Sequence, residues 1–221
     1  MHNLKIGLFY VMHVDYQSLI HLVFIGIITL FPVVNPIGTA LILNPYFDNL
    51  TRPQRKQAAK KIALYAFAIC TVTLLAGHWV LQLFGLSIPV IQVAGGIMIC
   101  KIGWESLWSG SNSSEKQDKA AHTAEAAASF NGLQDKLFYP VTFPITTGAG
   151  VISVLFTLGA RSTYEDAQDY LLNTGALLLA VIVICILIYV FYLNTKTLLQ
   201  YVGAKGENVL NRISAFLIFC V

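Results

Sequence analysis

Two nine-residue motifs contain the residues best suited to binding a small ligand. FPVVNPIGT covers residues 31–39 and YPVTFPITT covers residues 139–147, and the motifs share five identical residues at matching positions. The two prolines in each motif remove helical hydrogen bonds and clash with the preceding turn, at a cost of about 3 kcal/mol or more each. Both motifs therefore predict a broken helix in which backbone polar groups face a ligand.

The first motif predicts a helix start. Asn35 is a preferred N-cap residue, and Pro36 suits the first helical position. Gly38 leaves bare backbone open to a ligand, and Thr39 adds a hydroxyl group. We expect a half-helix that begins at Pro36, close to the middle of a membrane.

The second motif leads into a stretch of small polar residues. Pro144 is followed by Thr146, Thr147, Gly148 and Gly150. We expect the threonine hydroxyls to cap a second half-helix and the glycines to let a ligand approach the backbone. The two half-helix starts are predicted to meet near the bilayer centre, running in opposite directions.

Two such helix starts fit a small zwitterionic amino acid. The N-terminal end of a helix carries unpaired N–H groups and about half a positive charge, which favours a carboxylate. Carbonyl groups freed before Pro36 and Pro144 suit an ammonium group. The alternative is that these prolines only kink packed helices, as prolines in membrane helices often do. The repetition of the motif favours a ligand site.

The elements that position these motifs are membrane helices. Hydrophobic residues make up 56% of the chain and charged residues 11%, against about 45–50% and about 25% in soluble domains. Several stretches without Asp, Glu, Lys or Arg exceed the roughly 20 residues that cross a bilayer. They are 16–47, 62–100, 137–160 and 170–195. We expect an all-α membrane protein whose partner is the lipid bilayer, and the net charge of +3 gives no reason to expect nucleic acid.

Six spans in two halves are the predicted organisation. The 62–100 stretch divides at Gly85 and Pro89 into spans near 62–83 and 89–108, and a last span, apolar only after Arg212, covers 198–221. The small, polar residues 109–135 predict a flexible linker between halves 1–108 and 136–221. Because each half has three spans, the second must be inverted relative to the first. Residues 1–15 are expected to form an interfacial lead-in.

The positive charges predict the orientation. Loops 48–61, 101–136 and 196–212 carry five, four and three Lys or Arg residues, whereas the other side has only Lys5 and Arg161. Cytoplasmic loops are enriched in Lys and Arg, so both termini are predicted to lie outside. The basic start at 51–61 is expected to be a solvated helix start near anionic lipid headgroups.

The remaining polar residues argue against enzyme chemistry. No Asp, Glu or Lys lies deep in the first five spans, and the four cysteines are scattered singly through apolar segments. We therefore expect no catalytic residue, metal or cofactor, and we expect the cysteines to be free thiols. Gln92, a neutral polar residue in the third span, is a further candidate for substrate contact, although it suits a hydrogen bond across helices equally well.

Four ordered segments resemble the MarC family of multi-pass inner-membrane proteins. NPIGT at 35–39 resembles its first-span motif, FGLSIPVIQVAGGIMI at 84–99 its third, YPVTFPITTGAGVI at 139–152 its fourth, and NRISAFLI at 211–218 its sixth. The resemblance implies six spans in two inverted halves and, for members with an assigned activity, transport of small neutral amino acids. It also implies an inner-membrane location.

Two features depart from the family pattern. Thr147 and Ala149 stand where the family usually has alanine and proline, and nine residues follow Arg212 where the family continues through a full span. We expect a less sharply broken second half-helix and a last helix that is incomplete.

The predicted function is therefore secondary transport, as exporter or exchanger, of glycine, alanine or serine. A membrane channel or a scaffold protein that transports nothing is the alternative, because a pair of broken helices can also line a pore. Association into a homo-oligomer is compatible with the sequence but not specified by it.

Overall fold

The described part of the chain is helical throughout. The computed structural model describes residues 2–48, 50–85, 130–161 and 167–201, with single residues and short runs between 87 and 104 and between 206 and 216. In chain order the helices are α1 (His2–Val34), α2 (Pro36–Ile42), α3 (Asn44–Phe47), α4 (Arg52–Leu83), α7 (Phe130–Lys136), the wide helical segment η1 (Leu137–Thr146), α8 (Ala149–Arg161) and α9 (Ala167–Leu193).

Three described helices are long and apolar enough to cross a membrane, and a bent pair makes a fourth candidate. The three are Leu19–Ile42, Arg52–Gly77 and Tyr170–Leu193, and the pair joins Gly132–Thr146 to Ala149–Gly159. They correspond to the expected first, second, fifth and fourth spans. The expected third and sixth spans, near 89–108 and 198–221, lie largely outside the described residues.

Helix α4 begins in the basic run 51–61, as predicted. It starts at Arg52, so the loop expected over 48–61 ends at Thr51. Its start is fixed by a capping interaction, in which Thr51 N–H donates to Gln54 Oε1 at 3.0 Å. The first turns of α4 thus carry the basic residues.

Two other predicted boundaries also shift. Helix α1 starts at His2 and continues without interruption through the expected lead-in. Residues 130–135, predicted as the end of the linker, belong to α7, while 109–129 lie outside the described residues. The reason is packing, because Leu133 is buried and Lys61 Nζ donates to Gln134 Oε1 at 2.7 Å.

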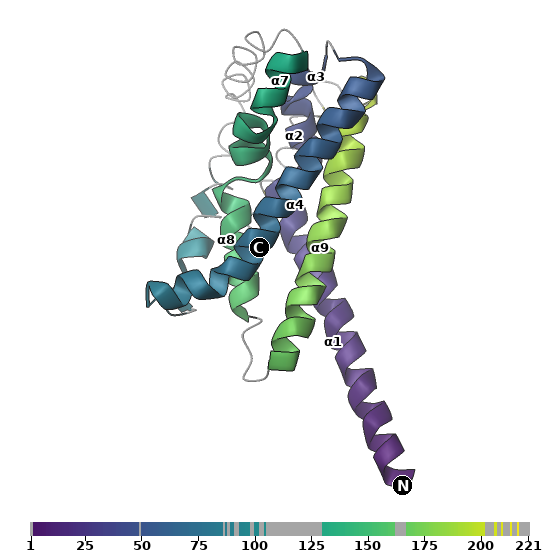
Figure 1. The fold of residues 1–221 in the computed structure, drawn as a ribbon, viewed down its shortest axis with the longest axis vertical. Coiled ribbons are helices and arrows are strands. Elements are labelled where there is room, and N and C mark those ends of the chain that lie inside the picture. The colour runs from purple at the N-terminus through teal and green to yellow at the C-terminus, as the bar shows by residue number, and fades with distance from the viewer. Residues whose placement is uncertain are drawn as a thin grey trace.

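Helix α9 lies between the other long helices. It packs against α1, α2 and α4, while α4 also packs against η1 and α8 (Figure 1). The crossing of α1 and α9 is close, since a Cβ atom on Gly26 would lie 2.8 Å from Cβ of Ala180. The helix α2 after the first break packs against α9, and η1 and α8 on either side of the second break pack against α4. Since α4 and α9 contact one another, the two breaks lie in one packed unit.

The outer surfaces of the long helices are apolar. Exposed residues recur four apart on α1 at Ile20, Phe24 and Ile28, and exposed Ile186 and Val190 follow the same spacing on α9. Such spacing keeps side chains on one face of a helix. An exposed apolar face of this kind suits contact with lipid tails.

Candidate functional site

The first helix break lies at Asn35, as predicted. Its backbone is left-handed (φ 44°, ψ 61°), a conformation that asparagine tolerates better than most residues. Asn35 Oδ1 accepts from Gly38 N–H at 3.1 Å, and Pro36 occupies the first turn of α2. The N-cap interpretation is confirmed. Because Leu19–Ile42 counts as one span, the break lies in the last third of that span rather than at its middle.

The polar groups around the first break are paired within the chain. Thr39 Oγ1 donates to the Asn35 carbonyl at 2.9 Å, and that carbonyl also accepts from Thr39 N–H at 2.9 Å. Pro36, Gly38 and Thr39 are all buried. The first motif therefore forms a turn that is closed by its own hydrogen bonds in this conformation.

The second break lies farther along the chain than the prolines predict. Tyr139 and Phe143 leave the helical conformation, as expected for residues that precede proline. The chain nevertheless continues as a π-helical turn beyond Pro144, because Thr147 N–H donates to the Thr142 carbonyl five residues earlier, at 2.8 Å. The next helix, α8, begins only at Ala149, and the two parts meet at an angle of 62°.

The threonine hydroxyls do not cap α8, so that prediction is wrong. They donate backward to carbonyl groups five residues earlier: Thr142 to Leu137 at 2.6 Å, Thr146 to Val141 at 2.8 Å, and Thr147 to Thr142 at 3.0 Å. A π-helical turn leaves backbone carbonyl groups that a hydroxyl can reach. The threonine hydroxyls therefore donate to carbonyl groups in η1 and do not accept from the first N–H groups of α8.

Gly148 occupies the N-cap position of α8. Its carbonyl accepts from Val151 N–H at 3.0 Å and from Ile152 N–H at 3.3 Å. A Cβ atom on Gly148 would lie 2.7 Å from the Pro144 carbonyl oxygen. The break therefore requires glycine here for the close approach of its own backbone. Gly150 is buried in the first turn of α8, whereas Pro144 is exposed.

Helix α9 lies against both breaks. The Tyr192 hydroxyl lies 2.8 Å from Thr146 Oγ1, and α2, which follows the first break, packs against the same helix. Tyr192 is fully buried, and its ring packs against Phe47 with 6.0 Å between centroids. Of the predicted site residues, Thr146 is thus bonded to α9, and Thr39 lies on α2, which packs against the same helix.

Sequence reasoning missed Tyr192 because it lies in an apolar stretch, 46 residues from Thr146. The available signal was a phenol hydroxyl inside a membrane span, since a buried hydroxyl requires a partner. Gln92 lies outside the described residues, so its candidacy stays a prediction.

The described residues include no cluster suited to a metal. No three His, Cys, Asp or Glu side chains lie together in this part of the chain. Cys70, Cys100 and Cys185 are free thiols, as predicted, while Cys220 lies outside the described residues. The polar groups at the breaks are the Asn35 amide, threonine and tyrosine hydroxyls and backbone groups, all of which bind by hydrogen bonds.

Comparison with known proteins identifies the family. The family model for MarC family integral membrane proteins matches residues 20–221. The chain belongs to the MarC family. It is 26% identical over 205 residues to the inner membrane protein MarC of Escherichia coli O1:K1, covering 89% of this chain and 88% of that protein.

A second MarC family member gives a similar match. The inner membrane protein MarC of Citrobacter koseri is 28% identical over 207 residues, with 89% of this chain and 88% of that protein covered. No solved structure matches the chain. Membership in the MarC family, together with the apolar helices, establishes an integral membrane protein with several spans.

Proposed function

We propose that this MarC family protein is a secondary transporter of small neutral amino acids in the inner membrane. The observation that carries the proposal is that the two helix breaks lie together: α2 packs against both η1 and α9, and Tyr192 of α9 bonds to Thr146 of η1. Transporters commonly place their substrate site where two broken helices of an inverted repeat meet. In this proposal the six spans form two inverted halves, with both termini outside.

The carboxylate of the substrate is assigned to the start of α8. The first N–H groups of this helix are those of Ala149 and Gly150, ahead of the Val151 N–H that donates to the Gly148 carbonyl, and a helix N-terminus favours a negative charge. The shorter helix α2 is a weaker candidate, because Asn35 already accepts from its Gly38 N–H. Hydroxyl oxygens of Thr39, Thr146 and Tyr192 are assigned to the ammonium group.

Substrate entry requires these hydroxyls to exchange partners. Thr146 and Tyr192 are buried against one another, so the conformation described here corresponds to a closed site. The substrate's ammonium group replaces the Tyr192 contact with Thr146 when the breaks separate. Such an exchange of hydrogen bonds costs little net free energy, which transport requires.

The selectivity follows from the same side chains. The described groups at the breaks are neutral, so a side-chain charge on the substrate would be buried without a partner. On the mildest scale that burial costs up to about 2.5–3.5 kcal/mol, the value that applies at the middle of the membrane. Glycine, alanine and serine are therefore the expected substrates, and lysine and glutamate are excluded.

Uptake of labelled alanine into proteoliposomes tests the proposal. Glycine and serine should compete, whereas lysine and glutamate should not, and uptake should saturate and discriminate between enantiomers. Equal inhibition by lysine contradicts the zwitterion site. Non-saturating uptake instead indicates a channel, and no uptake of any amino acid favours a scaffold protein.

A pair of matched variants tests whether the substrate binds at the first helix break. Thr39→Val keeps the side-chain shape and removes the hydroxyl that donates to the Asn35 carbonyl at the first break, so uptake should fall at least tenfold. Thr73→Val, at a partly exposed position within α4, should leave uptake unchanged. Normal uptake by Thr39→Val at wild-type expression contradicts the assignment of the site.

A further inference from the structure

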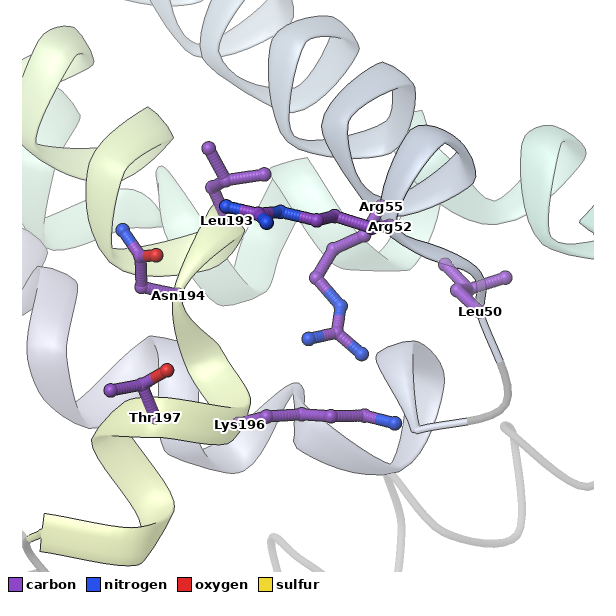
Figure 2. Close-up of a pocket in the computed structure, with 7 residues that line it drawn as sticks. All are labelled: Leu50, Arg52, Arg55, Leu193, Asn194, Lys196 and Thr197. Atoms are coloured by element: carbon purple, nitrogen blue, oxygen red, sulfur yellow. The ribbon is translucent and has the colours of Figure 1, made fainter.

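A pocket of about 400 Å³ lies where α4 begins and α9 ends. Figure 2 shows that it is lined by Leu50, Arg52, Arg55, Leu193, Asn194, Lys196 and Thr197. Three of these seven lining residues are cations and none is a carboxylate. Figure 2 also shows both arginine side chains extending from α4 towards the segment that carries Lys196. The pocket is therefore strongly suited to an anion.

Arg55 is the buried member of this group. The sequence predicts a solvated basic helix start, but the Arg55 side chain is only 7% exposed. Its Nη2 donates to the Phe47 carbonyl at 3.0 Å, whereas its buried Nε atom has no hydrogen-bond partner among the described residues. A buried cation with an unpaired donor is costly unless an acceptor meets it.

The charges of the protein leave the pocket positive. Asp48 lies 3.8 Å from Lys196 Nζ, and both side chains are at least half exposed, so this pair is weak. One carboxylate beside three cations leaves an excess of two positive charges. The N-terminus of α4, a helix of 32 residues, adds its partial positive charge from the same side.

The pocket also lies at the edge of the membrane. It lies at the first turns of the Arg52–Gly77 span and at the end of the Tyr170–Leu193 span. Both spans reach their polar ends there, so the pocket opens at headgroup depth. Basic pockets between membrane helices bind anionic lipid headgroups.

We infer that this pocket binds a phosphate group. Arginine pairs with phosphate through two parallel hydrogen bonds, and two arginines with one lysine match its charge. Thr197 adds a neutral hydroxyl group, and a volume of about 400 Å³ holds a phosphate together with a small substituent such as glycerol. The phosphate comes either from a phospholipid headgroup or from a soluble phosphate ester.

Binding to the purified full-length chain tests the inference, independently of any transport activity. Phosphatidylglycerol is titrated into phosphatidylcholine nanodiscs, and glycerol 3-phosphate and inorganic phosphate are titrated separately. Retained lipid is counted by native mass spectrometry, and the thermal midpoint is followed for each ligand. Arg52→Gln, Arg55→Gln and Lys196→Gln are compared with Lys56→Gln and Lys60→Gln, whose exposed side chains lie on α4 but do not line the pocket.

Loss of one charge-assisted contact should weaken binding about tenfold in each pocket variant and leave the Lys56 and Lys60 variants unchanged. If phosphatidylglycerol shows this pattern, the pocket binds the phosphate of a lipid headgroup. If only glycerol 3-phosphate or inorganic phosphate shows it, the pocket binds a soluble phosphate. Exposed Arg52 and Lys196 keep the test valid if Arg55→Gln fails to fold. Equal losses in pocket and control variants, or no binding of any of the three probes, overturn the inference.

Discussion

Tyr192 and Thr146 face one another across the second helix break, with their hydroxyl oxygens 2.8 Å apart and both residues at most 2% exposed. The contact joins the middle of the chain to the end of α9. Since Thr146 also donates to the Val141 carbonyl, Tyr192 supplies the proton of the shared hydrogen bond. One phenol hydroxyl thereby stabilises the position of η1 against α9.

The first prediction concerns that hydroxyl. Tyr192→Phe keeps the ring packed on Phe47 and removes one buried hydrogen bond, so it should destabilise the protein by about 1 kcal/mol. The thermal midpoint should fall by about 2–4 °C for a chain of this size. Reaction of a thiol dye with buried Cys70 and Cys185 reports unfolding, in a background with Cys100 and Cys220 replaced by serine. Tyr201→Phe, at an 87% exposed tyrosine, is the control and should not change the midpoint.

The second prediction separates two glycines. Gly148→Ala places a Cβ atom 2.7 Å from the Pro144 carbonyl, and backbone must move to accept it. Gly175→Ala adds a Cβ atom in α9 with nothing within 4 Å, and alanine favours a helix by about 1 kcal/mol over glycine. The thermal midpoint should fall for Gly148→Ala and should hold or rise for Gly175→Ala. The reverse order would show that the Pro144 contact does not limit this position.

The third prediction is a stabilising change. Thr71 Oγ1 is buried in α4 and has no hydrogen-bond partner among the described residues. Thr71→Val keeps the branched shape and removes that unsatisfied group, which costs about 1–3 kcal/mol when buried. The midpoint of thiol-dye labelling should rise. A drop would mean that the hydroxyl has a partner in solution.

The fourth prediction is the topology. Thr51 and Ser87 are exposed residues beyond opposite ends of α4, which is about 48 Å long at 1.5 Å per residue. The positive-charge pattern places Thr51 in the cytoplasm and Ser87 outside. In a version without native cysteines, Ser87→Cys should react in intact cells with a membrane-impermeant thiol reagent, and Thr51→Cys should react only after lysis. Labelling of Thr51→Cys in intact cells contradicts the orientation.

Local chemistry explains what sequence alone could predict. The break at Asn35 depends on neighbouring residues, an asparagine before a proline, and it lies where the sequence places it. The second break lies farther along the chain than the sequence places it. The hydrogen bond from Thr147 N–H to the Thr142 carbonyl continues the π-helical turn beyond Pro144. The choice between an ordinary and a wide turn depends on packing around Thr142 and Thr146, which no local pattern encodes.

Long-range contacts explain what the sequence did not show. Tyr192 reaches Thr146 from α9, which lies far along the chain. Arg55 is buried where its side chain donates to the Phe47 carbonyl. A basic run such as 52–61 has the composition of a solvated surface, so burial of one member becomes visible only when α3 and α9 are in place. Composition predicted the membrane class, whereas these contacts required the fold.

The central position of α9 has a consequence for biogenesis. The helices that pack most extensively on it, α1, α2 and α4, lie within the first 83 residues, whereas α9 starts at Ala167. During synthesis the early helices therefore enter the bilayer long before their partner is made. Small contact surfaces such as Gly26 face lipid until α9 arrives to cover them. Until then the packing available to the early helices is that of α4 against η1 and α8, which also precede α9 in the chain.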